Sequence, residues 1–419
     1  MWALRLLAFA EKRRARSPRA LDARWTRELE LGDRRLVLGD PRAQKALQKR
    51  LRKATLAIEA GAIAPATIQH RNAALLGAGL ALDPASHQLL SFAASAHVDG
   101  LIQEAFWQVG PAPSAVAFEL LAHVLGLDEA TIEAALGPGS FLHTTGLVRL
   151  AECRTYDHRE PLQLGPGLPL LFSRIHTSSE SLLRAFFRPT KATRLGLCDF
   201  AHIGPDLDII QRLLAAPQEG RNGRANVLLH GAPGTGKTEL ARAIAAALGA
   251  TLFEVNVDDD HGDPLSREAR LSACAVTQRM LAKRPRSLLL FDEIEDVFPH
   301  KGGRHDPESG RDKGFMVHLL EETPVPTLWI GNHVSQIDPA FLRRFDYALE
   351  LRAPPASVRR RLLEAALDGH AVTPDWLGSI AADARLTPAQ IERSARVTRT
   401  LEPAPGRATE SLFERVLAS

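Results

Sequence analysis

The sequence predicts an α/β protein with a parallel sheet, preceded by a mainly helical domain. From about residue 195, five apolar runs alternate with helical segments: "ANVLLHG", "TLFEVNV", "RSLLLFDEI", "PTLWIGN" and "ALELR". This alternation is typical of parallel strands joined by crossover helices. The earlier part of the chain reads instead as amphipathic helices with polar joints. We therefore expect a helical domain over 1–190, an α/β domain over 196–350 and a small helical domain over 351–419.

Composition is that of an ordinary globular protein. The chain has 419 residues, enough for two or three domains, with 45% hydrophobic and 24% charged residues. The net charge of +3 is too small to imply a polyanionic partner by itself. The charge is uneven, however, because residues 1–53 carry sixteen Lys and Arg against six Asp and Glu. The basic excess therefore lies in the N-terminal region.

The cysteines and the apolar segments predict a cytoplasmic protein. Cys153, Cys198 and Cys274 are odd in number and far apart, which fits neither a metal site nor a disulfide framework. The opening run "MWALRLLAFAEKRR" is short for a signal peptide. No apolar stretch approaches the roughly 20 residues that a membrane helix needs. We expect no membrane partner.

A glycine-rich loop follows the first strand of the α/β domain. "GAPGTGKT" matches G-x-x-x-x-G-K-[ST] and lies between a strand and a helix, the context that the motif requires. Glycines let successive N–H groups converge on an anion, and the helix start adds its positive dipole end. Lys237 is expected to contact the terminal phosphates, and Thr238 to offer a hydroxyl to Mg²⁺. The predicted ATP-binding residues of this loop are Gly231, Ala232, Pro233, Gly234, Thr235, Gly236, Lys237, Thr238 and Glu239.

Carboxylates follow the third strand, in "SLLLFDEIEDVF". Asp292 and Glu293 come at the carboxyl end of a buried strand, where ligands bind in an open parallel sheet. Asp292 is expected to hold Mg²⁺, directly or through water, and Glu293 to orient and polarise the attacking water. Glu295 and Asp296 are expected to be helix-capping or surface acids, without a chemical role.

The next strand and the segment after it add polar candidates. Asn332 ends "TLWIGN", where its amide can hold the water or the terminal phosphate; the alternative is a plain turn asparagine. Arg343 and Arg344 are adjacent in "QIDPAFLRRFDYALEL". They are candidate arginine fingers, and the alternative is a structural role in salt bridges.

These motifs together resemble the AAA+ ATPases. "GAPGTGKT", "LLLFDEIEDVF", "LWIGN" and "IDPAFLRRFD" occur in that family's order and approximate spacing, over roughly residues 196–419. The resemblance implies a five-stranded parallel sheet with helices on both faces and a small helical lid. It also implies a homo-oligomeric ring, usually a hexamer, with ATP at the subunit interfaces and an arginine supplied in trans.

The family's usual ending, D-P-A-x-x-R-P-G-R-F-D, is shortened here. Residues 338–343 match its left half and residues 344–346 its right half, without the Pro-Gly pair. Both arginines match, and either Arg343 or Arg344 would reach the neighbour's γ-phosphate, with Arg344 slightly favoured.

Two further segments gain meaning from the resemblance. "CDFAHIGPDLDIIQRLL" resembles the family's segment before the phosphate loop, which implies that His202 and Ile203 lie against the adenine; the alternative is an interdomain linker. "LTPAQIERSARV" predicts a helix with Thr387 and Gln390 as its capping box. By resemblance Arg393 is a candidate sensor, although a surface arginine is the favoured alternative.

One loop departs from the family pattern. Protein-threading members carry an aromatic residue after the second strand, whereas this chain reads "NVDDDHGDPLS". The departure weakens the case for peptide translocation by an aromatic loop. The polar groups of this loop form either a metal cluster or, as we favour, a solvated acidic loop; they are Asp258, Asp259, Asp260, His261 and Asp263.

Three functions follow from these patterns. The favoured one is a ring-forming ATPase that remodels proteins, with residues 1–188 recruiting the substrate. The second is an ATPase acting on nucleic acid through "EKRRARSPRALDAR" and "KRLRK", with residues 127–150 as a winged-helix fragment. The third is a slowly hydrolysing switch, against which Glu293, Asn332 and the two arginines argue.

Overall fold

In a computed structural model, the chain forms two compact units. The first comprises Met1–Phe186 and Val257–Val276, and the second comprises Phe187–Asn256 and Thr277–Ser419. The structure describes residues 1–12, 20–60, 67–109, 114–150, 162–215, 225–259, 261–298, 307–321, 323–401 and 407–419. The boundaries expected near residues 190 and 350 stay predictions.

The first unit is mainly helical, which confirms the expectation for the N-terminal region. Its helices up to α11 are α1 (Trp2–Lys12), α2 (Ala23–Glu28), α3 (Pro41–Glu59), α4 (Ile68–Leu80), α5 (Pro84–Val98), α6 (Gly100–Val109), α7 (Ser114–Leu125), α8 (Glu129–Leu136), α9 (Phe141–Thr145), α10 (Leu168–Ser173) and α11 (Ser179–Leu183). Helices α3 and α5 each begin with a proline that follows an aspartate N-cap. Asp40 and Asp83 accept hydrogen bonds from backbone N–H groups in the first turns of these helices.

Helix α5 forms the centre of this unit. It is buried without interruption from Leu89 to Ala96, as expected for a helix that is apolar all round. Asn72 of α4 is also buried, and its amide donates to the carbonyls of Phe172 at 3.0 Å and Arg174 at 2.7 Å. This side chain therefore ties α4 to the C-terminal end of α10.

The segment predicted as a winged-helix fragment forms short helices and a hairpin. Helices α7, α8 and α9 are followed by the antiparallel pair β3 (Val148–Leu150) and β4 (Leu162–Leu164). Of these elements, α8, α9 and β3 lie within residues 127–150, and the winged-helix interpretation of that segment stays a prediction. The last of the three helices reads "FLHTT" and contains neither lysine nor arginine. A second antiparallel pair, β1 (Ala20–Leu21) and β2 (Leu36–Val37), lies nearer the N-terminus.

The second unit contains the predicted parallel sheet. Its strands are β5 (Phe187–Pro189), β6 (Asn226–His230), β7 (Thr251–Val255), β8 (Ser287–Phe291), β9 (Thr327–Gly331) and β10 (Tyr347–Glu350), in the order β10-β6-β9-β8-β7-β5. Five of them are parallel, as expected. The sixth, β5, pairs antiparallel with β7 and was not predicted. Three residues ending in Pro189 give little strand signal, and proline is tolerated on an edge strand.

Helical segments complete the second unit. They are the 3₁₀ turns η1 (Leu197–Ile203), η2 (Ile294–Asp296) and η3 (Val334–Gln336), with α12 (Pro205–Ala215), α13 (Lys237–Ala247), α14 (Arg267–Leu281), α15 (Pro307–Glu321) and α16 (Pro339–Leu342). The first ten residues of α14 belong to the first unit. On one face of the sheet, Ile210 of α12 and Ile244 of α13 pack against Val227, Leu290 and Ile330.

An aromatic cluster covers the other side of the central strands. Phe291 ends β8, and its ring centroid lies 5.1 Å from that of Trp329 on β9. Phe298, Phe341 and Phe345 complete the cluster, with the Phe298 and Phe341 centroids 5.3 Å apart. Aromatics make up only 5% of the chain, so their concentration here marks a site of close packing.

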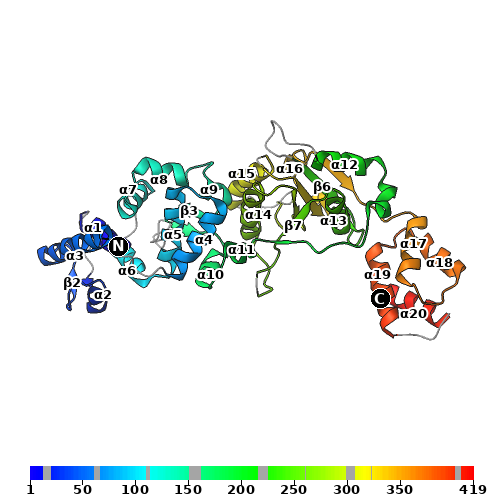
Figure 1. Ribbon diagram of the computed structural model, residues 1–419, viewed down its shortest axis with the longest axis horizontal. Coiled ribbons are helices and arrows are strands. Elements are labelled where there is room, and N and C mark those ends of the chain that lie inside the picture. Colours follow the sequence, from blue (N-terminus) through cyan, green and yellow to red (C-terminus); the bar gives the residue numbers. More distant parts are fainter. Residues whose placement is uncertain are drawn as a thin grey trace. The chain divides into compact units, whose positions relative to one another are not determined.

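The predicted helical lid consists of α17 (Ala356–Ala366), α18 (Pro374–Ala382), α19 (Pro388–Leu401) and α20 (Arg407–Leu417), drawn in orange to red in Figure 1. Leu363, Trp376, Ile391 and Phe413 form its core. The indole N–H of Trp376 also donates to Glu414 at 2.7 Å, so the one polar atom of this ring has a partner.

Two remaining expectations concern membranes and cysteines. Within the described ranges, no helix is both long and apolar enough to cross a bilayer. Cys198 is an exposed free thiol, and Cys274 is a buried one whose pKa is raised by burial. Cys153 lies outside the described residues.

Candidate nucleotide-binding site

The phosphate loop connects β6 to α13 through a backbone that requires glycine. Gly231, Gly234 and Gly236 have φ angles of 137°, 79° and 97°, in the region that L side chains rarely adopt. A Cβ at Gly231 would also lie 2.3 Å from the carbonyl oxygen of Leu351. The loop therefore needs both the conformational freedom and the small size of these residues.

Lys237, the first residue of α13, points back into the loop. Its Nζ donates to the carbonyl oxygens of Gly231 at 2.8 Å and Ala232 at 3.0 Å, and to Oδ1 of Asn332 at 2.9 Å. The residue is 6% exposed. Burial lowers the pKa of its ammonium group, whereas the nearby carboxylates of Asp292 and Glu295 raise it.

These contacts fit a site for an anion. The oxygens that accept from Lys237 are all neutral, although burying a charge is costly unless an opposite charge balances it. The N-terminus of α13 directs its N–H groups and positive dipole end to the same place. A phosphate in the loop would place a negative charge in direct contact with the ammonium, in addition to the nearby carboxylates of Asp292 and Glu295.

The two predicted Mg²⁺ ligands lie next to each other. The hydroxyl of Thr238 donates to Oδ2 of Asp292 at 3.1 Å, and Oδ1 of Asp292 accepts from the backbone N–H of Glu293 at 2.8 Å. The structure thus joins the loop after β6 to the end of β8. A hydroxyl and a carboxylate are the hard oxygen donors that Mg²⁺ uses together with phosphate oxygens and waters.

Glu293 follows Asp292 in an unusual backbone conformation. Its φ and ψ are both 54°, in the left-handed region that is uncommon for residues other than glycine. Strain of this kind costs of order 1–3 kcal/mol and collects at functional sites. The side chain is exposed at the carboxyl edge of the sheet, on the same edge as Asp292.

Asn332 lies at the end of β9, between Lys237 and Glu295, for which no chemical role was expected. Besides accepting from Lys237, its amide Nδ2 donates to Oε1 of Glu295 at 2.8 Å. The backbone N–H of Asn332 is directed at the same carboxylate, at 3.2 and 3.3 Å from its oxygens. The expectation that Glu295 caps a helix or lies on the surface was wrong, because it is half-buried and bound to Asn332. Its position three residues after Asp292, across a tight turn, was the available signal.

The segment predicted to contact the adenine lies beside the phosphate loop. Phe200 of η1 is buried, and a Cβ at Gly236 would lie 3.7 Å from its ring. Ile203 packs against the sheet core, whereas His202 is exposed. Partial desolvation lowers the pKa of His202, and Arg361 of the lid adds to this effect. The adenine contacts of His202 and Ile203 stay predictions.

Helix α19 of the lid touches the phosphate loop with its N-terminus. Thr387 and Gln390 form the predicted capping box, since the N–H of Thr387 donates to Gln390 at 2.9 Å. The N–H of Ala389 donates to the carbonyl of Gly234 at 3.2 Å. Arg393 instead points along the lid and lies within 3.4 Å of acceptors on the last residues of the chain. That position agrees with the favoured alternative of a surface arginine.

Glu239 takes part in a contact behind the loop. Its carboxylate accepts from the hydroxyl of Thr193 at 2.6 Å and from Arg242 at 2.5 Å. The side chain of Glu239 therefore links α13 to the segment before η1. The remaining predicted loop residues, Pro233 and Thr235, lie at the turn, where Thr235 Oγ1 donates to the carbonyl of Ala232 at 3.0 Å.

The two adjacent arginines have different surroundings. Arg344 donates to Glu321 at 2.9 Å and to the carbonyl of Ala340, and its side chain is 19% exposed. The backbone N–H of Arg343 donates to the carbonyl of Pro339 at 3.3 Å, whereas its side chain is exposed and makes no hydrogen bond or ion pair with the residues that the structure describes. Arg344 is therefore held within its own chain, whereas Arg343 extends into solvent.

The aromatic cluster fixes the segment that carries these arginines. Phe341 and Phe345 flank them in sequence and pack on Phe298, with ring centroids 5.3 and 6.3 Å away. Asp346 then accepts from the backbone N–H of Asn226 at 2.7 Å and donates its own N–H to the Asn226 carbonyl at 2.9 Å. The arginine pair is thus held at a defined position relative to β6.

The acidic loop after β7 is closed on itself. Asp259 accepts from the backbone N–H groups of His261 at 2.7 Å and Asp263 at 3.1 Å. Across the described ranges there is no group of three or more His, Cys, Asp or Glu suited to a metal. Asp260 lies outside those ranges. The choice between a metal cluster and a solvated loop therefore stays a prediction.

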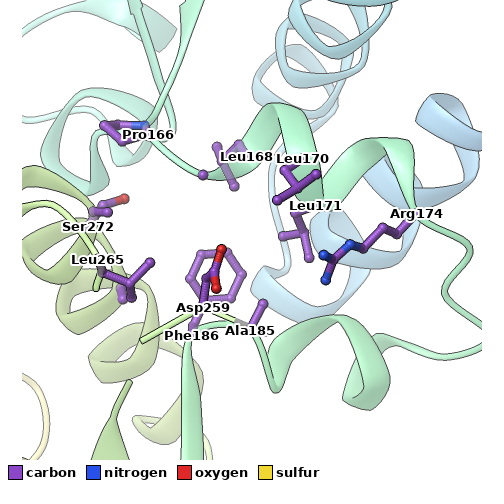
Figure 2. Close-up of a pocket in the computed structure, with 13 residues that line it drawn as sticks. Pro166, Leu168, Leu170, Leu171, Arg174, Ala185, Phe186, Asp259, Leu265 and Ser272 are labelled. Atoms are coloured by element: carbon purple, nitrogen blue, oxygen red, sulfur yellow. The ribbon is translucent and has the colours of Figure 1, made fainter. Parts of the chain in front are cut away.

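Figure 2 shows a small pocket of the first unit beside this loop. Its volume is about 110 Å³, and Leu168, Leu171 and Leu265 supply apolar walls while Arg174 and Asp259 add polar groups. Ligand sites are usually clefts of about 300–1,000 Å³. The pocket is therefore a packing gap between α10 and the segment after β7, and no ligand is assigned to it.

A family model agrees with this fold and site. Residues 227–353 match the model of the "ATPase family associated with various cellular activities (AAA)". The matched range runs from the strand before the phosphate loop to the residues after β10. Residues 227–353 therefore form a domain of the AAA type, and the match is limited to this part of the chain.

Several curated proteins are similar to part of this chain. The human ATPase family gene 2 protein homolog B is 34% identical over 145 residues, which are 33% of this chain and 19% of that protein. The ATPase histone chaperone abo1 of Schizosaccharomyces pombe is 29% identical over 42% of this chain and 15% of its own. The ATP-dependent zinc metalloprotease FtsH of Nitrosococcus oceani is 33% identical over 33% of this chain and 23% of its own.

These similarities are partial in both directions. The matched region spans about a fifth of the first of these relatives, 19% of its length. Among solved structures, the FIGL-1 AAA domain in complex with ADP superimposes with a TM-score of 0.42 at 18% identity, over 55% of this chain and 87% of that one.

The Lys237 contacts generate a first prediction. Lys237→Ala should weaken ATP binding at least about tenfold, because a hydrogen bond to a charged group contributes about 1.5–3 kcal/mol. Calorimetric titration with ATP measures this change. Lys191→Ala, which removes an exposed lysine of the same unit, is the control and should bind as the wild type does. Unchanged affinity in Lys237→Ala would refute the phosphate-loop assignment.

Proposed function

We propose that this protein binds ATP and Mg²⁺, hydrolyses ATP in a homo-oligomeric ring, and uses the energy to remodel protein substrates. The observation that supports the ATPase most directly is the convergence of three strand ends. Lys237, Asn332 and the Thr238–Asp292 pair come from β6, β9 and β8 and meet at one edge of the sheet.

Each residue has a distinct task in this proposal. Lys237 holds the terminal phosphates, and Thr238 with Asp292 would hold Mg²⁺, which supplies charge neutralisation on the phosphates when bound. Glu293 accepts the proton of the attacking water or orients it. His202 and Ile203 of η1 contact the adenine, and Ala389 of α19 closes the lid side of the loop.

The role of Glu293 generates the second prediction. Glu293→Gln should bind ATP and assemble normally but hydrolyse it about 10²–10⁴ times more slowly, because general-base catalysis contributes that factor. Steady-state phosphate release measures the change. Glu364→Gln, on the exposed face of lid helix α17, is the matched control and should turn over at the wild-type rate. Near-normal turnover in Glu293→Gln would remove its proposed role.

Arg343 is the better candidate for the finger that acts on a neighbouring subunit. A finger must extend from its own chain to reach another, and Arg343 is exposed while Arg344 bonds to Glu321. This reverses the slight preference for Arg344 that we drew from the sequence motif. Arg344 then serves as the residue that holds α16 in place.

The arginines give the third prediction. Arg343→Ala should reduce ATP turnover about 10³-fold, the lower range for an arginine finger. Arg344→Ala is the control and should stay within about threefold of wild type while melting at a lower temperature. Mixing Arg343→Ala with Lys237→Ala should restore part of the activity, because each subunit supplies what its neighbour lacks. Loss in Arg344→Ala alone, or no rescue on mixing, would contradict the assignment and the trans arrangement.

A protein substrate is favoured by the relatives that act on proteins. Two of them are named as a histone chaperone and a zinc metalloprotease. We propose that the helical first unit recruits the client, that the ring is a hexamer, and that the protein works in the cytoplasm. ATP-loaded Glu293→Gln, which should hold its client, is the form from which to identify it.

One observation favours a second candidate, an ATPase acting on nucleic acid. Helix α3 carries exposed Lys45, Lys49 and Arg52, spaced so that they share one face, opposite the buried Ala43 and Leu47. Two other basic residues of α3, Arg50 and Lys53, are already paired with Glu30. Part of the predicted basic segment, residues 13–19, lies outside the described ranges.

The two candidates differ in their salt dependence, which gives the fourth prediction. If α3 binds nucleic acid, replacing Lys45, Lys49 and Arg52 by glutamine should weaken binding and reduce the slope of log K against log salt by about three. Fluorescence anisotropy with labelled single-stranded and duplex oligonucleotides measures both. The control replaces Lys191, Lys283 and Arg396, three exposed basic residues of the second unit. No binding by the wild type at low salt would eliminate this candidate.

A further inference from the structure

We infer that Glu295 is a positioning residue for ATP hydrolysis, because it fixes which end of the Asn332 amide faces the phosphate loop. The inference rests on the proposed ATPase function and assigns a role that the family match does not give. It also decides which of two tasks Asn332 performs.

Asn332 is held from both sides. Oε1 of Glu295 accepts from Nδ2 of Asn332 at 2.8 Å, and the same carboxylate lies 3.2 and 3.3 Å from the Asn332 backbone nitrogen. On the opposite side of the amide, Oδ1 accepts from Nζ of Lys237 at 2.9 Å. The three groups form a chain from Glu295 through Asn332 to Lys237.

The chemistry of the two neighbours allows only one orientation of this amide. A carboxylate can only accept hydrogen bonds, and an ammonium can only donate them. Nδ2 must therefore face Glu295, and Oδ1 must face Lys237. A flipped amide would place an oxygen against the carboxylate and an NH₂ group against the ammonium, which replaces two attractive contacts by two repulsive ones.

The backbone is shaped to bring Glu295 to this place. The left-handed conformation of Glu293 turns the chain after β8, so that η2 runs back toward the end of β9. Gly331 leaves the necessary space, since a Cβ there would lie 2.8 Å from Cγ1 of Ile294 and 3.2 Å from Oε2 of Glu295. The contact between Glu295 and Asn332 therefore explains both the strained backbone of Glu293 and the glycine at position 331.

The fixed orientation makes Asn332 a hydrogen-bond acceptor toward the phosphate loop. An acceptor suits an ammonium or the O–H of a water, and it does not suit a phosphate oxygen, which has no hydrogen to donate. Of the two tasks that the sequence left open, Oδ1 of Asn332 therefore orients the attacking water rather than the terminal phosphate. When no phosphate is bound to Lys237, its ammonium group donates to Oδ1 of Asn332 instead.

Glu295→Gln tests the inference with little change in shape. Glutamine has the same length but can donate or accept, so it no longer dictates the orientation of the Asn332 amide. We expect kcat to fall about tenfold, the equivalent of one hydrogen bond, with KM for ATP within about twofold of wild type. Glu364→Gln on α17, whose partner is Arg360, is the matched control and should keep both constants.

A double-mutant cycle separates positioning from a general structural role. In an Asn332→Ala background, Glu295→Gln should change kcat by less than about twofold, because its partner is already absent. An equal loss of kcat in both backgrounds, or wild-type kcat in Glu295→Gln, would overturn the inference. A parallel fall in melting temperature with a raised KM would also overturn it, as the signature of a structural acid.

A second readout does not depend on hydrolysis. In nucleotide-free protein labelled at asparagine, the side-chain NH₂ of Asn332 should exchange slowly with solvent and should lose that protection in Glu295→Gln. If the wild type lacks ATPase activity, the proposed function fails while this measurement still decides the Glu295 contact. If the wild type is active and the protection is the same in both proteins, the inference alone fails.

Discussion

The buried ammonium group of Lys237 is the constraint on which the candidate site depends. A partly desolvated positive charge needs oxygen acceptors around it. The chain supplies these oxygens from the ends of separate strands. The carbonyls of the phosphate loop and Oδ1 of Asn332 contact it directly, while the carboxylates of Asp292 and Glu295 oppose the effect of burial on its pKa. The strand order that places β6 between β9 and β10 makes this convergence possible.

The second constraint is the packing behind the site. Asn226 is buried at the start of β6, where its side chain accepts from the indole of Trp329 at 2.8 Å and donates to the carbonyl of Leu320 at 2.8 Å. Its backbone binds Asp346. This one residue thus connects β6, β9 and α15 through its side chain, and the end of the arginine segment through its backbone. Its hydrogen bonds are direction-dependent, so they fix the arginine segment more sharply than apolar packing alone would.

The lid and the phosphate loop share an interface that couples them. The carbonyl of Gly234 accepts from Ala389, and a Cβ at Gly234 would lie 2.8 Å from the Ala389 side chain. Any rearrangement of the loop around a bound phosphate therefore acts on the N-terminus of α19.

The segment Val257–Val276, which follows β7, belongs to the helical first unit. The chain therefore uses the connection after β7 as part of that unit.

The sequence predicted the parts of the site whose chemistry follows from local rules. The phosphate loop needs glycines next to a lysine, and a buried strand ending in acids needs no knowledge of distant residues. For the same reason the parallel sheet, the lid and the α19 capping box were all predictable. The edge strand β5 was missed because three residues carry too little pattern.

Tertiary structure alone decided which side chains meet. No chemical role for Glu295 could be predicted from the sequence, because its partner Asn332 is 37 residues away and becomes a neighbour only through the pairing of β8 with β9. Arg343 and Arg344 were near equivalents in the sequence, because adjacent residues differ in exposure only once Glu321 of α15 binds one of them. Local propensity and motif spacing are encoded along the chain, whereas the orientation of an amide or the freedom of a guanidinium depends on contacts that exist only after the strands have paired.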